Sequence, residues 1–187
     1  MVALSTRYRF SVEDYHRMAE AGIFTEDDRV ELIEGEVLPM SPIGSRHAAC
    51  VEKLADSLKQ HFNGRAMVRT QNPILLSDHS EPEPDLCVVR PRDDYYASGK
   101  PTAADTLLVI EVADATLEYD RQIKLPLYAR HGIAEAWLVD LVTNRVEVHR
   151  QPTRDGYEQV QRFEGEQLVV SPSFEEIQLA ADSILLR

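Results

Sequence analysis

The stretch TLLVIEVAD, residues 106–114, constrains the fold more than any other part of the sequence. Four apolar residues from Leu107 to Ile110 follow one another, which is the pattern of a strand buried inside a sheet. Glu111 interrupts this pattern, although a buried carboxylate costs free energy unless a cation or hydrogen-bond donors compensate it. The sequence therefore predicts a covered sheet with a polar site at the end of one strand.

Patterns elsewhere predict an alternation of helices and strands. Residues 11–21 have the features of a first helix, and 29–40 those of a hairpin that turns at Glu34-Gly35. Apolar residues spaced by three and four indicate a second helix that Ser45 caps and Asn63-Gly64 ends. The later predicted elements are a strand in 66–76 that Pro73 interrupts, strands at 85–89, 106–112, 134–140, 145–150, 157–163 and 167–170, a helix at 120–131 closed by Gly132, and a last helix from about Ser173.

This element order predicts one domain over residues 1–187, of the α/β or α+β class, with a single sheet flanked by helices. The two cysteines lack metal or redox spacing and are expected to be buried thiols in a reducing compartment. No apolar run is long enough to span a membrane and no secretory leader is recognisable, so a cytoplasmic location is expected.

The net charge of −12 counts against non-specific binding to nucleic acid, whose phosphates attract basic surfaces. Residues 42–72 are a local exception, because they hold five basic residues against two acidic ones. This excess is compatible with a modest phosphate-facing surface and equally with an ordinary solvated helix face.

A second carboxylate, Asp85 in PDLCVV, also stands at the start of a buried strand. If the two strands are neighbours, Asp85 and Glu111 could share a hard divalent cation such as Mg²⁺, which prefers oxygen ligands. Lys124 would complete the set if the helix after Glu111 folds back over the strand end, since a lysine can orient metal-bound water or stabilise developing charge. The alternative is a surface ion pair without chemistry.

Several segments, in this order, carry a resemblance to a known family. They are ELIEGEV, SRHAACVEKLADSL, EPDLCVV, LLVIEVAD and YDRQIKLPLYARHGIAEAWLVD. The series resembles the Uma family of endonucleases, formerly a domain of unknown function, within the restriction-endonuclease-like PD-(D/E)xK superfamily. The resemblance covers residues 29–150. It implies that superfamily's core, a mixed central sheet flanked by helices, with a helix and hairpin before it and extra strands after it.

The resemblance also implies roles for five residues. Asp85 and Glu111 would bind Mg²⁺ or Mn²⁺, and Lys124 would be the catalytic lysine, supplied from the following helix because Ala113 stands where the simple motif has it. Glu31 and His47 match further positions near the site. Pro126 departs from a regular helix pattern, so that either the helix begins near Gln122 or it kinks.

The leading hypothesis is thus a metal-dependent endonuclease that hydrolyses DNA phosphodiester bonds, as a homodimer. The alternative is a catalytically inactive protein with the nuclease fold that acts as a binding module, which the acidic net charge favours. A two-carboxylate glycosidase has no other support in the sequence.

Overall fold

The computed structural model describes residues 7–25, 27–171 and 174–185. Its centre is a six-stranded sheet in the order β3-β4-β5-β6-β7-β8. Neighbouring strands are antiparallel except β5 and β6, which are parallel. The predicted mixed central sheet is confirmed. The strands are β3 (Met67–Thr70), β4 (Leu86–Val89), β5 (Thr106–Ala113), β6 (Glu135–Asp140), β7 (Arg145–Thr153) and β8 (Gly156–Phe163).

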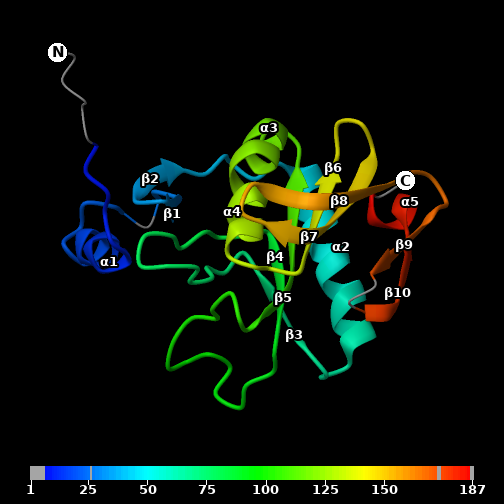
Figure 1. Ribbon diagram of the computed structural model, residues 1–187, viewed down its shortest axis with the longest axis horizontal. Coiled ribbons are helices and arrows are strands. Elements are labelled where there is room, and N and C mark those ends of the chain that lie inside the picture. The colour runs from blue at the N-terminus through cyan, green and yellow to red at the C-terminus, as the bar shows by residue number, and fades with distance from the viewer. Residues whose placement is uncertain (1–6, 26, 172–173, 186–187) are drawn as a thin grey trace.

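Helices cover both faces of this sheet (Figure 1). One face packs on α2 (Ser45–Phe62), and the other on α4 (Leu125–Arg130). Between β5 and α4 lie α3 (Leu117–Tyr119) and one π-helical turn, η1 (Asp120–Lys124). Because side chains alternate along a strand, Leu108, Ile110 and Val112 join the α2 core while Val109 and Ala113 join the α4 core. Glu111 therefore faces the helix that carries Lys124.

The N-terminal part forms a separate layer at one end of the sheet (Figure 1). It consists of α1 (Val12–Glu20) and the hairpin of β1 (Val30–Ile33) and β2 (Glu36–Pro39). Ser11 caps α1 in a reciprocal pair with Asp14. The hairpin turns at Glu34 and Gly35, both with positive φ. The hairpin is joined to the segment before β4, since Leu32 bridges to Glu81.

The C-terminal part differs from its prediction. Residues Phe174–Ala180 form strand β10, which pairs antiparallel with β9 (Leu168–Ser171), and only α5 (Ala181–Ile184) is helical. The prediction of a helix from about Ser173 was wrong, although Ser173 itself lies outside the described residues. Pairing with β9 buries Ile177 in the α2 core, and this tertiary contact outweighs the local helix signal.

No helix within the described ranges is long and apolar enough to cross a membrane.

Candidate functional site

One cavity brings together the five residues that the sequence singled out. It has a volume of about 310 Å³, and its lining includes Glu31, His47, Asp85, Glu111 and Lys124. They come from the hairpin, the first turn of α2, the residue before β4, strand β5 and η1. The fold thus brings these five residues to one cavity from five segments of the chain.

Glu111 and Lys124 form a buried ion pair in this cavity. Lys124 Nζ lies 2.9 Å from Glu111 Oε1, and the residues are 4% and 2% exposed. Burial lowers the pKa of Lys124, but the carboxylates of Glu111 and Glu31 outweigh it and hold this pKa well above its usual range. Burial raises the pKa of Glu111, and the positive charge of Lys124 offsets part of this rise. Each charge therefore depends on the other to remain in the interior.

Glu31 supplies a second counter-charge to the lysine. Its Oε2 atom lies 3.4 Å from Lys124 Nζ, and the lysine also donates to the carbonyl oxygen of Glu83 at 3.0 Å. Glu31 is itself held by two donors, the backbone N–H of Glu83 at 3.0 Å and the hydroxyl of Tyr119 at 3.2 Å. A glutamate on a hairpin strand is thereby fixed in the interior, where it orients the ammonium group.

Asp85 links strand β5 to helix α2. Its Oδ2 atom accepts the backbone N–H of Val112 at 2.8 Å and lies 3.0 Å from His47 Nε2. Strand β4 begins only after Asp85, and its pairing with β5 ends before Val112. The side chain of Asp85 therefore satisfies a backbone amide of β5 that has no partner on β4. The hydrogen bond to Asp85 raises the pKa of His47, whose Nδ1 atom is buried without a hydrogen-bond partner. His47 therefore positions the aspartate.

Three further polar residues were missed from the sequence: Asp120, Tyr119 and Tyr128. Asp120 lines the cavity, accepts the Thr116 hydroxyl at 2.6 Å, and has a pKa that burial raises to about 6. The Tyr128 hydroxyl donates to Glu111 Oε1 at 2.5 Å. A signal was present, because Asp120, Lys124 and Tyr128 are spaced by four residues, which places side chains on one helix face.

The π-helical turn resolves the question raised by Pro126. The segment is already helical from Leu117, and η1 closes with the N–H of Leu125 bonded to the carbonyl of Asp120. Pro126 then falls in the first turn of α4. The wider turn before it relieves the clash that a proline makes in a regular helix, and π-turns of this kind are frequent at functional sites.

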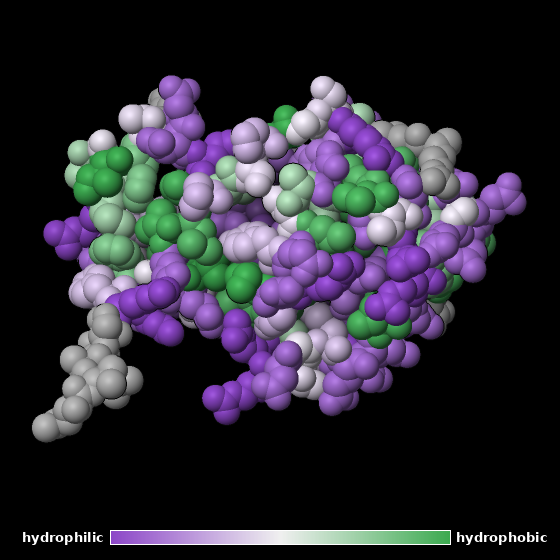
Figure 2. All heavy atoms as spheres, turned by 90° about the horizontal axis from the view of Figure 1, so that it is seen from above, coloured by the Kyte–Doolittle hydropathy of each residue, from purple (hydrophilic) through white to green (hydrophobic). Residues whose placement is uncertain are grey.

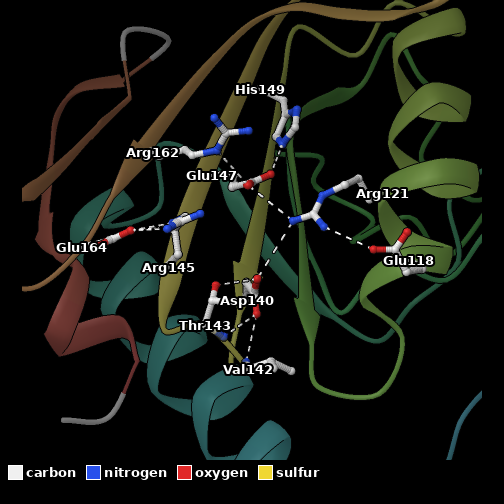
Figure 3. A network of polar contacts seen from close by, with 10 residues as sticks. All are labelled: Glu118, Arg121, Asp140, Val142, Thr143, Arg145, Glu147, His149, Arg162 and Glu164. Atoms are coloured by element: carbon white, nitrogen blue, oxygen red, sulfur yellow. Dashed lines mark hydrogen bonds and ion pairs between the residues drawn. The ribbon is translucent and has the colours of Figure 1, made fainter.

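Arg121 anchors this turn to the sheet through a second polar network (Figure 3). Its guanidinium group lies 3.4 Å from Glu147 on β7 and 4.0 Å from Asp140 on β6. Glu147 also contacts His149 at 3.2 Å and Arg162 at 3.1 Å. The hydrogen bond from His149, together with these arginines, lowers the pKa of Glu147 to about 2. The network fixes the turn from which Lys124 enters the cavity.

The basic residues of 42–72 are engaged within the protein where their contacts are resolved. Arg46 donates to the carbonyl of Leu141 at 2.7 Å and to Asn144 at 2.6 Å. Arg69 donates to Asn72 at 3.0 Å. These contacts favour the interpretation of ordinary structural arginines over that of a dedicated phosphate-binding surface.

A hard divalent cation fits the donor set of the cavity. Within residues 7–25, 27–171 and 174–185, no three histidine, cysteine or acidic side chains form a group that could hold a metal ion alone. Mg²⁺, however, commonly uses one or two carboxylates and keeps several waters. Asp85 and Glu111 are adjacent, since the Asp85 N–H lies 3.4 Å from Glu111 Oε2. Burial penalises the charged forms of Glu111 and Asp120, and a cation would offset that penalty.

Comparison with known proteins identifies the family. No curated protein matches the chain significantly. The fold matches a crystal structure described as "a putative nuclease belonging to DUF820" from Anabaena variabilis ATCC 29413, with a TM-score of 0.72 and 18% sequence identity. The match covers 95% of this chain and 98% of that one, and at this identity it shows the fold. The profile of the Uma2 family, "Putative restriction endonuclease", matches residues 12–182, so the resemblance is confirmed and the chain belongs to this family.

Proposed function

We propose that the protein is a Mg²⁺- or Mn²⁺-dependent endonuclease that hydrolyses phosphodiester bonds of DNA. The observation that carries the proposal is the buried Lys124 beside Glu111, in one cavity with Asp85. A desolvated lysine held among carboxylates is costly to keep in a protein interior, and groups perturbed in this way cluster at functional sites. Membership of a nuclease family supports the reaction class.

Each residue has a role in this proposal. Asp85 and Glu111 would hold the metal ion, which when bound would supply Lewis acidity and make a water molecule more acidic. Lys124 places a fixed positive charge beside the position where negative charge develops on the phosphoryl oxygens. Glu31 orients Lys124, and His47 holds Asp85 in place. The electrostatic environment is thus formed before the substrate arrives.

The test is cleavage of plasmid and single-stranded DNA by the purified protein with Mg²⁺ or Mn²⁺. We expect Asp85→Asn to lower the rate by at least about a hundredfold, as loss of a central electrostatic group does. Asp155→Asn, in the exposed turn between β7 and β8, is the matched control and should cut as the parent does. Equal rates for Asp85→Asn and the parent would remove the proposal.

The net charge of −12 favours a second candidate, a nuclease-fold protein that binds a basic partner without catalysis. Calorimetry with Mn²⁺ separates the two candidates. Metal binding that is lost in both Asp85→Asn and Glu111→Gln supports the enzyme, whereas absence of such binding favours the binding module.

The proposal includes a cytoplasmic homodimer. Both cysteines, Cys50 and Cys87, are free and buried, which suits a reducing compartment. Light scattering during size-exclusion chromatography measures the dimer directly.

A further inference from the structure

The cavity has two chemically distinct zones. The charged side chains of Glu111 and Lys124 are almost fully buried, whereas the exposed part of the lining carries apolar residues beside the polar residues Ser41 and Asp114. The apolar residues, here called the rim, are Pro39, Met40, Pro42, Ile43 and Ala115. Ile43 is 42% exposed, so an apolar side chain stands in solvent beside a charged interior. With a divalent cation at Asp85 and Glu111, as proposed above, a phosphate group suits the interior, and a base or sugar suits the rim.

The size of the cavity limits what can enter it. About 310 Å³ is at the small end of the range for ligand pockets, which enclose most of a compact ligand. A single nucleotide is a ligand of this size. In a duplex each base is paired and is stacked between its neighbours. A whole nucleotide therefore enters such a pocket only after it is unpaired and unstacked. Figure 2 shows the corresponding hollow, between the end of the molecule that holds the hairpin and the part that holds α3.

Charge acts in the same direction. Duplex DNA carries a negative charge for every ~1.7 Å of its axis, twice the density of one strand. A protein with a net charge of −12, whose Arg46 and Arg69 are engaged internally, repels a duplex more strongly than a single strand.

We propose that the cavity takes one nucleotide of an unpaired strand, so that the protein cuts single-stranded DNA and leaves intact duplex uncut. This inference rests on the proposed nuclease function and adds the substrate class. The phosphate lies near Asp85, Glu111 and Lys124, while the sugar or base contacts Ile43 and its neighbours on the rim.

The first experiment compares a single-stranded DNA circle with a relaxed, covalently closed duplex circle of the same sequence. Neither has ends, so only strand pairing differs. We expect the single-stranded circle to be cut at least about a hundredfold faster, because a duplex must first unstack a nucleotide. A duplex with an internal bubble should be cut within the bubble. Equal rates on both circles would overturn the inference while leaving the nuclease function intact.

The second experiment measures binding without cleavage, by fluorescence anisotropy of labelled oligonucleotides with Ca²⁺ in place of Mg²⁺. The single strand should bind more tightly than the matched duplex. Ile43→Ser should weaken single-strand binding about tenfold and raise KM with little change in kcat. The matched control is Ile23→Ser, because Ile23 is 61% exposed but lies outside the cavity.

The two proposals can fail separately. If neither circle is cut, the nuclease function fails and binding decides the inference. Duplex binding as tight as single-strand binding, no binding of either, or equal loss in Ile43→Ser and Ile23→Ser would each overturn it.

Discussion

Lys124 Nζ lies 2.9 Å from Glu111 Oε1 in the interior, and this contact holds the candidate site together. Glu31 and Glu111 both lose their counter-charge if the lysine is removed. Lys124→Met should therefore lower the free energy of unfolding by about 3–5 kcal/mol, besides abolishing cleavage. Urea denaturation measures the change, and Lys59→Met on the exposed face of α2 is the control.

A double variant isolates the pair. Glu111→Gln combined with Lys124→Met removes both charges, so its loss of stability should be smaller than the sum of the two single losses. Strict additivity would contradict the mutual dependence of the two residues.

Tyr128 provides the next prediction. Its hydroxyl donates to Glu111 Oε1, and burial and the Glu111 charge hold its pKa well above the usual range, so it stays a donor. Tyr128→Phe should lower stability by about 1.5–3 kcal/mol, as expected for a hydrogen bond to a charged group. It should also raise the Mg²⁺ concentration needed for half-maximal cleavage. Tyr95→Phe, at a 74% exposed position, should change neither quantity.

The cysteines should be inert in the folded protein. Burial raises the pKa of Cys50 to about 11 and that of Cys87 to about 12, so the reactive thiolate is scarce near neutral pH. A disulfide reagent at mildly alkaline pH should modify neither thiol until denaturant is added, when both react. Rapid modification of the native protein would show that one thiol is accessible.

Acid should destabilise the protein partly through Glu147. Its pKa is about 2 in the folded state and 4.5 when unperturbed, so the folded state binds the proton more weakly. Its stabilising contribution is present above about pH 4.5 and is lost as the pH falls towards about 2. Glu147→Gln should flatten the dependence of stability on pH in this window. Thermal melts measure this dependence. If the melting temperature of Glu147→Gln changes with pH across the window as much as that of the parent, the assignment to Glu147 is refuted.

Much of the fold could be predicted because the signals were local. The apolar run before Glu111 and the turn at Glu34-Gly35 depend on neighbouring residues, and the structure has both elements. The prediction of the last helix was wrong because it relied on acidic residues near the expected helix start, which are a local signal. The pairing of this segment with β9 is a tertiary contact that such a signal does not show. Ser45 was expected to cap α2, but Gly44 occupies that position.

The candidate site could be predicted only in part for the same reason. Asp85 and Glu111 stand out because each carboxylate breaks an apolar pattern. The partners that hold them do not stand out, since the Tyr128 hydroxyl and the backbone of Glu83 become visible only once the chain is folded. The π-helical turn could not be predicted either. Pro126 indicates that the helix is irregular near this position, but it does not indicate which irregularity forms.

The parallel pairing of β5 and β6 has a consequence for how the site forms. The connection between these strands contains η1 and α4, so Glu111 and Tyr128 are separated by only 17 residues. Glu31 and Tyr119 are separated by 88. Closing a short loop costs less chain entropy than closing a long one. We therefore expect the strand–helix half of the site to assemble early during folding, and the hairpin that bears Glu31 to dock onto it later.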